Sequence, residues 1–167
     1  MRIPLLFITC VVAPSILSPA NPDAQAKNQF SVTLRTPNEP TKSGTELRLR
    51  VTITNVSNHD VVFERTPGAI PDETLTYHVE IRDEHGQAPE KTAFFHDRNE
   101  NEGAFGSYTR YVLKPGESFD DAIVVTRLYT LAKPGKYRIS VARGQRALGG
   151  PPKDAVRSNE ITAVVVP

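Results

Sequence analysis

The four histidines carry the most versatile chemistry in the chain, because imidazole can bind a metal or transfer a proton near neutral pH. His78 precedes Glu80 by two residues, a pair that could bind a metal only with a further ligand from elsewhere. His96 precedes Asp97, and this pair could act in acid–base catalysis if its loop closed over a cleft. No nucleophile elbow, HExxH motif or glycine-rich phosphate loop accompanies them. We therefore expect a protein that is not an enzyme and has no cofactor.

Two long segments without a strand pattern, 87–107 and 144–157, are expected to be loops, and loops of this length are often functional. The first contains Phe94 and Phe95. If it is extended, the two rings point in roughly opposite directions, so that one can enter the core while the other anchors a partner. Alternatively, the loop folds back and buries both rings.

Arginines bracket the second segment, and we expect Arg143, Arg146 and Arg157 to form a small, solvated basic rim. Asp120 and Asp121 lack the loop spacing of a known calcium motif and are expected in a solvated turn. We predict no catalytic and no metal-binding residues. The residues predicted to contact a partner come from both loops: Phe94, Phe95, His96, Arg98, Phe105, Arg146 and Arg157.

The N-terminal residues predict export. The positive charge of Arg2 is followed by about ten mostly apolar residues, which fits a signal peptide and is too short for a bilayer span of roughly 20. Cleavage is expected after Ala26, with Ala20 as the alternative site and a non-cleaved anchor as the other interpretation. We expect a signal peptide over 1–26 and one domain over 27–167, located in the periplasm or outside the cell.

Cysteine usage and charge exclude several classes of protein. The only cysteine, Cys10, lies in the expected signal peptide, so the remaining chain can form neither a disulfide framework nor a thiolate metal site. The formal net charge of +1 provides no basic excess for binding nucleic acid or an anionic membrane. We therefore expect no nucleic-acid partner, no membrane span in the mature chain, and a monomer.

Apolar and polar residues alternate with period two along much of the chain, whereas a period of 3.6 is nowhere sustained. The clearest case is 47–53, where every second residue is leucine, valine or isoleucine. This pattern predicts a strand with one face in the core and one in water. Further strands are predicted at 30–34, 61–64, 75–81, 108–113, 119–126, 137–141 and 161–166.

Turn signals separate these strands. Pro115-Gly116 and Pro134-Gly135 each place proline before glycine, the order that suits the two central positions of a type II turn. Asn55-Val56-Ser57 fits the glycosylation acceptor pattern, although an asparagine at a strand end is also expected for a turn. Seven or eight strands joined by turns, without helices to cross over, predict antiparallel sheets packed face to face.

The chain resembles bacterial secreted immunoglobulin-like β-sandwich modules in four segments: 49–57, 113–118, 134–139 and 158–162. The similarity covers most of residues 29–166 and implies an all-β, immunoglobulin-like antiparallel sandwich. Tyr137 is expected to form the tyrosine-corner hydrogen bond of such folds. More loosely, the chain is similar to the bacterial intracellular proteinase inhibitor family, which implies inhibition, but no inhibitory loop matches residue by residue.

A fold alone does not give a function. From the export signal and the loops, we expect a non-catalytic binding or protein-interaction module of the cell envelope. Its partner would be a protein or another envelope component. A proteinase inhibitor with a β-sandwich fold is one alternative, and a small metal-dependent hydrolase using the His96/Asp97 loop is another.

Overall fold

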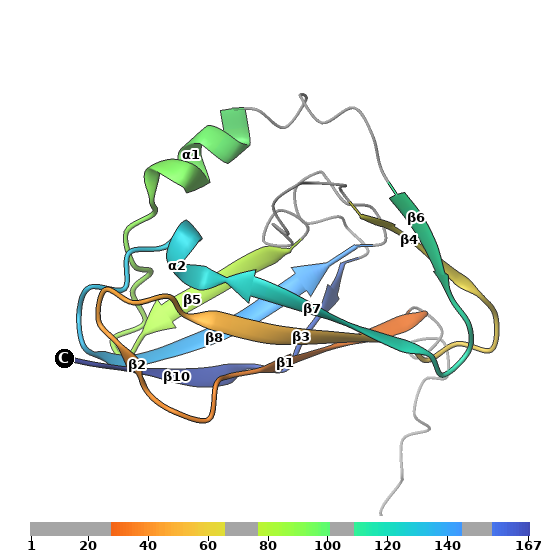
Figure 1. Cartoon of the computed structure of the whole chain (residues 1–167), viewed down its shortest axis with the longest axis horizontal. Helices are drawn as coiled ribbons and strands as arrows, with labels where there is room; N and C mark the ends of the chain where they lie inside the picture. The colour runs from red at the N-terminus through yellow and green to blue at the C-terminus, as the bar shows by residue number, and fades with distance from the viewer. Residues whose placement is uncertain (1–27, 66–76, 101–108, 145–154) are drawn as a thin grey trace, which may run out of the picture.

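Two packed β-sheets form the body of the molecule (Figure 1). The computed structural model describes residues 28–65, 77–100, 109–144 and 155–167. Its strands are β1 Phe30–Arg35, β2 Thr41–Lys42, β3 Arg48–Asn55, β4 Val61–Arg65, β5 His78–Asp83, β6 Thr109–Leu113, β7 Ser118–Val124, β8 Gly135–Arg143, β9 Val156–Arg157 and β10 Ile161–Val166. Its helices are α1 Ala93–Glu100 and α2 Val125–Leu128. Within these residues, no helix has the length and apolar character needed to cross a membrane.

The strand order identifies the sandwich type. One sheet has the order β1-β3-β7, and the other has the order β2-β10-β8-β5, with β9 also paired to β8. Every pairing in these two sheets is antiparallel except that of β2 with β10. Immunoglobulin sandwiches place strands A, B and E in one sheet and C, F and G in the other. With β1, β3 and β7 as A, B and E, and β5, β8 and β10 as C, F and G, the predicted fold is confirmed.

The core lies between the sheets, where the alternating residues of the facing strands meet. Leu49, Val51 and Ile53 of β3 are fully buried, and Ile139 and Val141 of β8 are buried in the same cluster. Burying each such side chain stabilises the fold by about 1.5–3 kcal/mol relative to exposure. The predicted half-buried strand at 47–53 is thus confirmed, with its polar residues facing outward.

Tyr137 makes the predicted tyrosine corner. Its Oη donates a hydrogen bond to the Lys133 carbonyl at 2.7 Å, at the start of β8, and burial raises the pKa of its phenol. The turn before β7 is also confirmed, since the Glu117 N–H donates to the Lys114 carbonyl and Gly116 has a φ of 80°. Gly135 has a φ of 156° and already begins β8, so the type II turn predicted there is wrong.

Three other details differ from the sequence-based expectation. The predicted strand at 119–126 ends at Val124, and the next four residues form α2. The predicted loop at 87–107 contains α1, and the predicted loop at 144–157 ends in β9. The two-residue strands β2 and β9 are too short to produce a recognisable alternation, because they contribute only one pair of side chains each.

The β3/β7 ribbon continues around a corner into a second ribbon formed by β4 and β6. Thr54 pairs with Ser118 on one side of the corner, and Val61 pairs with Leu113 on the other. Between these pairs, six residues (55–60) intervene on one side of the ribbon and four (114–117) on the other. The bend carries the β4/β6 ribbon, which we call the arm, away from the sheet that it extends (Figure 1).

Asn55 holds this corner. Its backbone pairs with Gly116 and Glu117, and its side-chain Nδ2 donates to the carbonyls of His59 and Leu113, both at 2.8 Å. Its Oδ1 accepts hydrogen bonds from the Ser57 backbone and hydroxyl. The side chain is buried, with both Nδ2 hydrogens used. In the folded protein, Asn55 is therefore no glycosylation acceptor, and its place in the Asn-x-Ser pattern has a structural cause.

Aromatic rings fill the space under the arm. Phe63 of β4 is fully buried and meets Phe30 of β1 edge to face, with ring centres 4.9 Å apart. It also packs against Phe119 and Tyr111, and these last two rings form a further edge-to-face pair at 4.9 Å. An isolated two-stranded ribbon is marginally stable in water, so this aromatic cluster must hold the arm in place.

Arg143, at the end of β8, is fully buried where the arm meets both sheets. Its Nη1 donates to the Tyr77 Oη at 2.9 Å and to the Asp121 carboxylate at 3.2 Å, and its Nη2 donates to the Glu64 carbonyl at 3.3 Å. The Tyr77 Oη donates in turn to Asp121 at 2.8 Å, and burial raises the pKa of Tyr77 well above its ordinary value. The guanidinium also faces the rings of Phe63, Tyr77 and Phe119, with its Cζ 4.9–5.5 Å from their centres.

This arrangement corrects two predictions. Arg143 is no part of a solvated rim, and Asp121 is no turn residue, because both side chains are completely buried. Strand alternation could have shown this. Arg143 has the same parity as the inward Ile139 and Val141 in β8, and Asp121 has the parity of Ile123 in β7.

Replacing Arg143 with methionine leaves the Asp121 carboxylate buried without its cation. We expect a loss of about 3–5 kcal/mol in the free energy of unfolding, measured by urea denaturation. Exchanging Asp121 for asparagine in the same chain should recover part of the loss, because the uncompensated charge disappears. Arg50→Met is the matched control, since it breaks an exposed ion pair with Asp120 that water screens and should change the free energy of unfolding far less. Equal losses in the two single variants would contradict the role assigned to Arg143.

Replacing Asn55 with alanine removes four side-chain hydrogen bonds at the corner and leaves the buried Leu113 carbonyl without its Nδ2 donor. We expect a loss of about 2–3 kcal/mol in the free energy of unfolding, because each unsatisfied buried group costs about 1–3 kcal/mol. Asn58→Ala, in the same loop but exposed, serves as the control and should change stability little. An Asn55→Ala variant as stable as the wild type would show that the corner does not depend on this side chain.

Candidate functional site

The first of the two predicted loops contains α1, and Thr92 anchors the start of this helix. The Thr92 Oγ1 accepts a hydrogen bond from the Phe95 N–H at 3.3 Å, as threonine does when it caps a helix N-terminus. The same hydroxyl donates to the Arg127 carbonyl, and the Thr92 N–H donates to the Leu128 carbonyl at 3.0 Å. The start of α1 is thereby fixed to α2. A threonine just before an apolar triplet was the sequence signal for this helix.

Phe94 and Phe95 are both partly buried against the core. This outcome lies between the two alternatives from the sequence, which were one buried and one exposed ring, or two buried rings. Adjacent side chains on a helix are separated by about 100° rather than 180°, so both can face the same side. The Phe95 ring lies 5.7 Å from that of Tyr129, and the Lys91 Nζ lies 4.3 Å from the Phe95 ring centre. His96 is exposed beside Phe95, at a ring-centre distance of 6.0 Å.

A pocket of about 370 Å³ lies beside the start of α1. Three chain segments line it: the loop from Gly44 to Glu46, Thr92, and the end of α2 with the residues after it, namely Thr126 and Tyr129 to Ala132. Tyr129 and Leu131 are almost completely buried and provide an apolar floor. Tyr129 links this pocket to the sheet, because its Oη donates a hydrogen bond to the Val79 carbonyl at 3.0 Å.

Threonine hydroxyls form much of the pocket rim. Those of Thr45 and Thr92 donate to backbone carbonyls, and the Thr92 oxygen also accepts from the Phe95 N–H, so each hydroxyl oxygen keeps a lone pair that can accept from a ligand. That of Thr126 accepts from the Leu47 N–H at 3.2 Å and keeps its own hydrogen for another acceptor. An apolar floor with a few placed polar groups is the usual composition of ligand pockets. The pocket can therefore accept an apolar group and orient it by hydrogen bonds at the rim.

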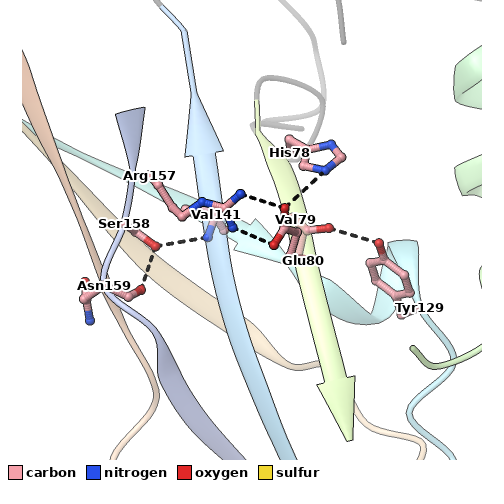
Figure 2. Close-up of polar contacts among 8 residues, drawn as sticks. All are labelled: His78, Val79, Glu80, Tyr129, Val141, Arg157, Ser158 and Asn159. Carbon is pink, nitrogen blue, oxygen red and sulfur yellow. Dashed lines mark hydrogen bonds and ion pairs between the residues drawn. The ribbon is translucent and has the colours of Figure 1, made fainter. Parts of the chain in front are cut away.

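A polar cluster lies on the outer face of the sheet formed by β2, β10, β8 and β5. Figure 2 shows Arg157 of β9 reaching across β8 to Glu80 of β5, with nitrogen–oxygen distances of 2.6 and 2.9 Å. His78 lies on the far side of Glu80, with its Nε2 3.9 Å from the carboxylate. Ser158 accepts from the Val141 N–H and donates to the Asn159 carbonyl. Arg157 thus joins β9 to β5, which do not pair directly.

The Arg157 guanidinium lowers the pKa of Glu80, chiefly through the paired hydrogen bonds and then through its charge. The side chains of Arg157, Glu80 and His78 are all about half exposed. His78 and Glu80 share the exposed face of β5. Within the described part of the chain, no group of three or more histidine, cysteine, aspartate or glutamate side chains could hold a metal ion.

The predicted partner-binding residues do not gather at one place in the described structure. Phe94, Phe95 and His96 lie on α1, whereas Arg157 is engaged by Glu80 on the outer sheet face. The Arg98 side chain, Phe105 and Arg146 lie outside the described residues, as does the expected signal peptide over 1–26. The pocket was missed by sequence reasoning because threonines from three separate segments carry no common motif.

Comparisons with known proteins add only distant structural likenesses. No protein-family model matches the chain, and no curated protein sequence matches it. The CARDB domain of the PF1109 protein from Pyrococcus furiosus, solved in complex with di-metal ions, is 13% identical with a TM-score of 0.41, and the match covers 82% of this chain and 92% of that one. The C-terminal domain of wzt is 12% identical with a TM-score of 0.44, over 83% and 74% of the two chains.

A β-glucosidase from Listeria innocua, in complex with isofagomine, is 15% identical with a TM-score of 0.41. That match covers 81% of this chain but 16% of the enzyme, so the likeness concerns a small part of it. The assignment of the immunoglobulin-like sandwich accordingly rests on the strand order, the register and the tyrosine corner described above.

Replacing Arg157 with glutamine removes the main cause of the low Glu80 pKa, which should then rise toward its ordinary value. In the wild type, a lowered folded-state pKa means that the ion pair stabilises the fold above the unfolded-state pKa. That contribution is lost as the pH falls through the folded-state pKa. An NMR titration of the Glu80 carboxyl measures the shift. Arg50→Gln is the control, because it should raise the pKa of Asp120 and leave Glu80 unchanged. A Glu80 pKa that is equal in wild type and Arg157→Gln would contradict the ion pair.

Proposed function

We propose that this protein is an exported, non-catalytic binding module of the cell envelope, and that it holds a protein or other envelope component at the pocket beside α1. The observation that carries the proposal is the pocket itself: an apolar floor of Tyr129 and Leu131 under a rim of threonine hydroxyls, assembled from three separate segments. Rigid sandwiches commonly bind through segments at their ends, where sequence can vary without loss of the core.

The non-catalytic part of the proposal is supported by the roles of the charged groups. The buried pair of Arg143 and Asp121 is shielded from any substrate, and the exposed Glu80 is held by Arg157. The export part rests on the positive charge of Arg2 and the mostly apolar run that follows it. Partner contact also agrees with the exposed His96 and the half-buried Phe94 on the neighbouring helix.

Replacing Thr130 with tryptophan should fill the pocket without disturbing the core. The Thr130 side chain is exposed, and its backbone N–H keeps its hydrogen bond to the Glu90 carbonyl. The full chain is immobilised and exposed to cell-envelope extract, and each retained component is then purified and titrated. We expect the Thr130→Trp variant to bind that component about tenfold more weakly or worse, as for a residue central to an interface.

Thr33→Trp is the matched control, because Thr33 is exposed on β1 of the β1-β3-β7 sheet and does not line the pocket. Circular dichroism verifies that both variants fold. Equal affinity of the wild type and Thr130→Trp would remove the pocket from consideration. Stoichiometric inhibition of a serine, cysteine or metalloprotease by the chain would instead favour the proteinase-inhibitor alternative, and metal retained after dialysis would favour the hydrolase.

A further inference from the structure

Three cationic side chains lie together on the outer face of the sheet that contains β5 and β8, away from the pocket residues. Arg138 and Lys136 alternate along β8, and Arg82 lies opposite Arg138 on β5. All three are exposed. In the part of the chain that the structure describes, none of them forms an ion pair with a carboxylate.

The register brings the two arginines close together. The Val141 N–H and carbonyl both bond to Ser158, so the backbone of Val141 faces away from β5. Backbone direction alternates along a strand, and Arg138 therefore faces β5 in the closely bonded type of pair, with Cα atoms about 5.5 Å apart. Like charges directly opposite each other on one sheet face are destabilising.

The other sheet contains a matching pair with a different outcome. Arg35 of β1 lies opposite Arg50 of β3, also on an exposed face. There, Arg50 is bound by the carboxylate of Asp120, which also accepts a hydrogen bond from Thr52. No carboxylate of the described residues forms such an ion pair with Arg82 or Arg138. Glu80 pairs with Arg157 and interacts with Arg82 only through its charge, and the exposed Glu84 and Glu160 form no ion pair in the described structure.

From this cluster of cations, which form no ion pair among the described residues, we propose that Arg82, Arg138 and Lys136 form a binding site for a phosphate monoester group. A phosphate monoester carries a charge of about −1.5 to −2 and three acceptor oxygens, so it can meet two guanidinium forks and an ammonium at once. A carboxylate has one charge and two oxygens, too few for three cations. Arg82 is held in place by a bond from its Nη1 to the Gly86 carbonyl at 3.0 Å, with its other donors still available.

The site is independent of the pocket beside α1, because none of its residues lines that pocket. The test is an NMR titration of the full chain with inorganic phosphate and with glycerol 3-phosphate, at constant ionic strength held with sodium chloride. A parallel arm measures binding to vesicles containing phosphatidic acid, compared with phosphatidylcholine alone. The two arms distinguish a small phosphate compound from a lipid headgroup as the source of the group.

We expect shifts at Arg82, Lys136 and Arg138, and we expect Arg138→Gln to raise the Kd by about tenfold or more. Phosphate should also raise the Tm of the wild type, because a ligand that binds only the folded state stabilises it. Arg35→Gln, which changes the matching pair on the other sheet, should keep the wild-type Kd and the Tm increase. If neither arm shows binding that depends on Arg138, or if Arg35→Gln weakens it equally, the proposal is overturned.

Discussion

The buried charge of Arg143 is the interaction on which the rest of the structure depends. A guanidinium removed from water must find partners for its hydrogens, and here they come from β4, β7 and the residue before β5. The two sheets and the arm are therefore fixed relative to one another by one side chain. Apolar packing could hold the same elements together, but it is tolerant of small shifts, whereas hydrogen bonds to a fixed carboxylate and carbonyl are directional.

The arm exists because the β3/β7 ribbon turns at Asn55. An asparagine side chain can donate two hydrogen bonds and accept others, and here it replaces the strand-to-strand bonds that are interrupted at the bend. The arm then places Phe63 in contact with Phe30 and Phe119 and supplies the Glu64 carbonyl to Arg143. The corner and the buried arginine are thus parts of one arrangement.

The two proposed binding surfaces differ in physical character. The pocket beside α1 has an apolar floor and a hydroxyl rim, so recognition there would rest on shape and on burial of an apolar group. The cationic cluster on β5 and β8 is open, and recognition there would rest on charge and be weakened by salt. The cationic cluster lies on the sheet that also carries the tyrosine corner, and the pocket is bonded to that sheet through Tyr129. A rigid scaffold therefore positions each surface.

The amino-acid sequence by itself determined the sandwich, because period-two alternation in 47–53, 137–141 and the other strands decides which side chains can be buried together. It also determined the turn at Pro115-Gly116, which follows from the local preferences of proline and glycine, whereas the corner role of Tyr137 was implied by the resemblance to immunoglobulin-like sandwiches. Only the tertiary structure decided that Arg143 meets Asp121 and Tyr77, which lie 22 and 66 residues from it in sequence. The same holds for the pocket, whose threonines belong to three segments, and for Arg82 opposite Arg138, whose proximity follows from strand register. Such contacts depend on how distant strands align, and no local pattern of residues encodes that alignment.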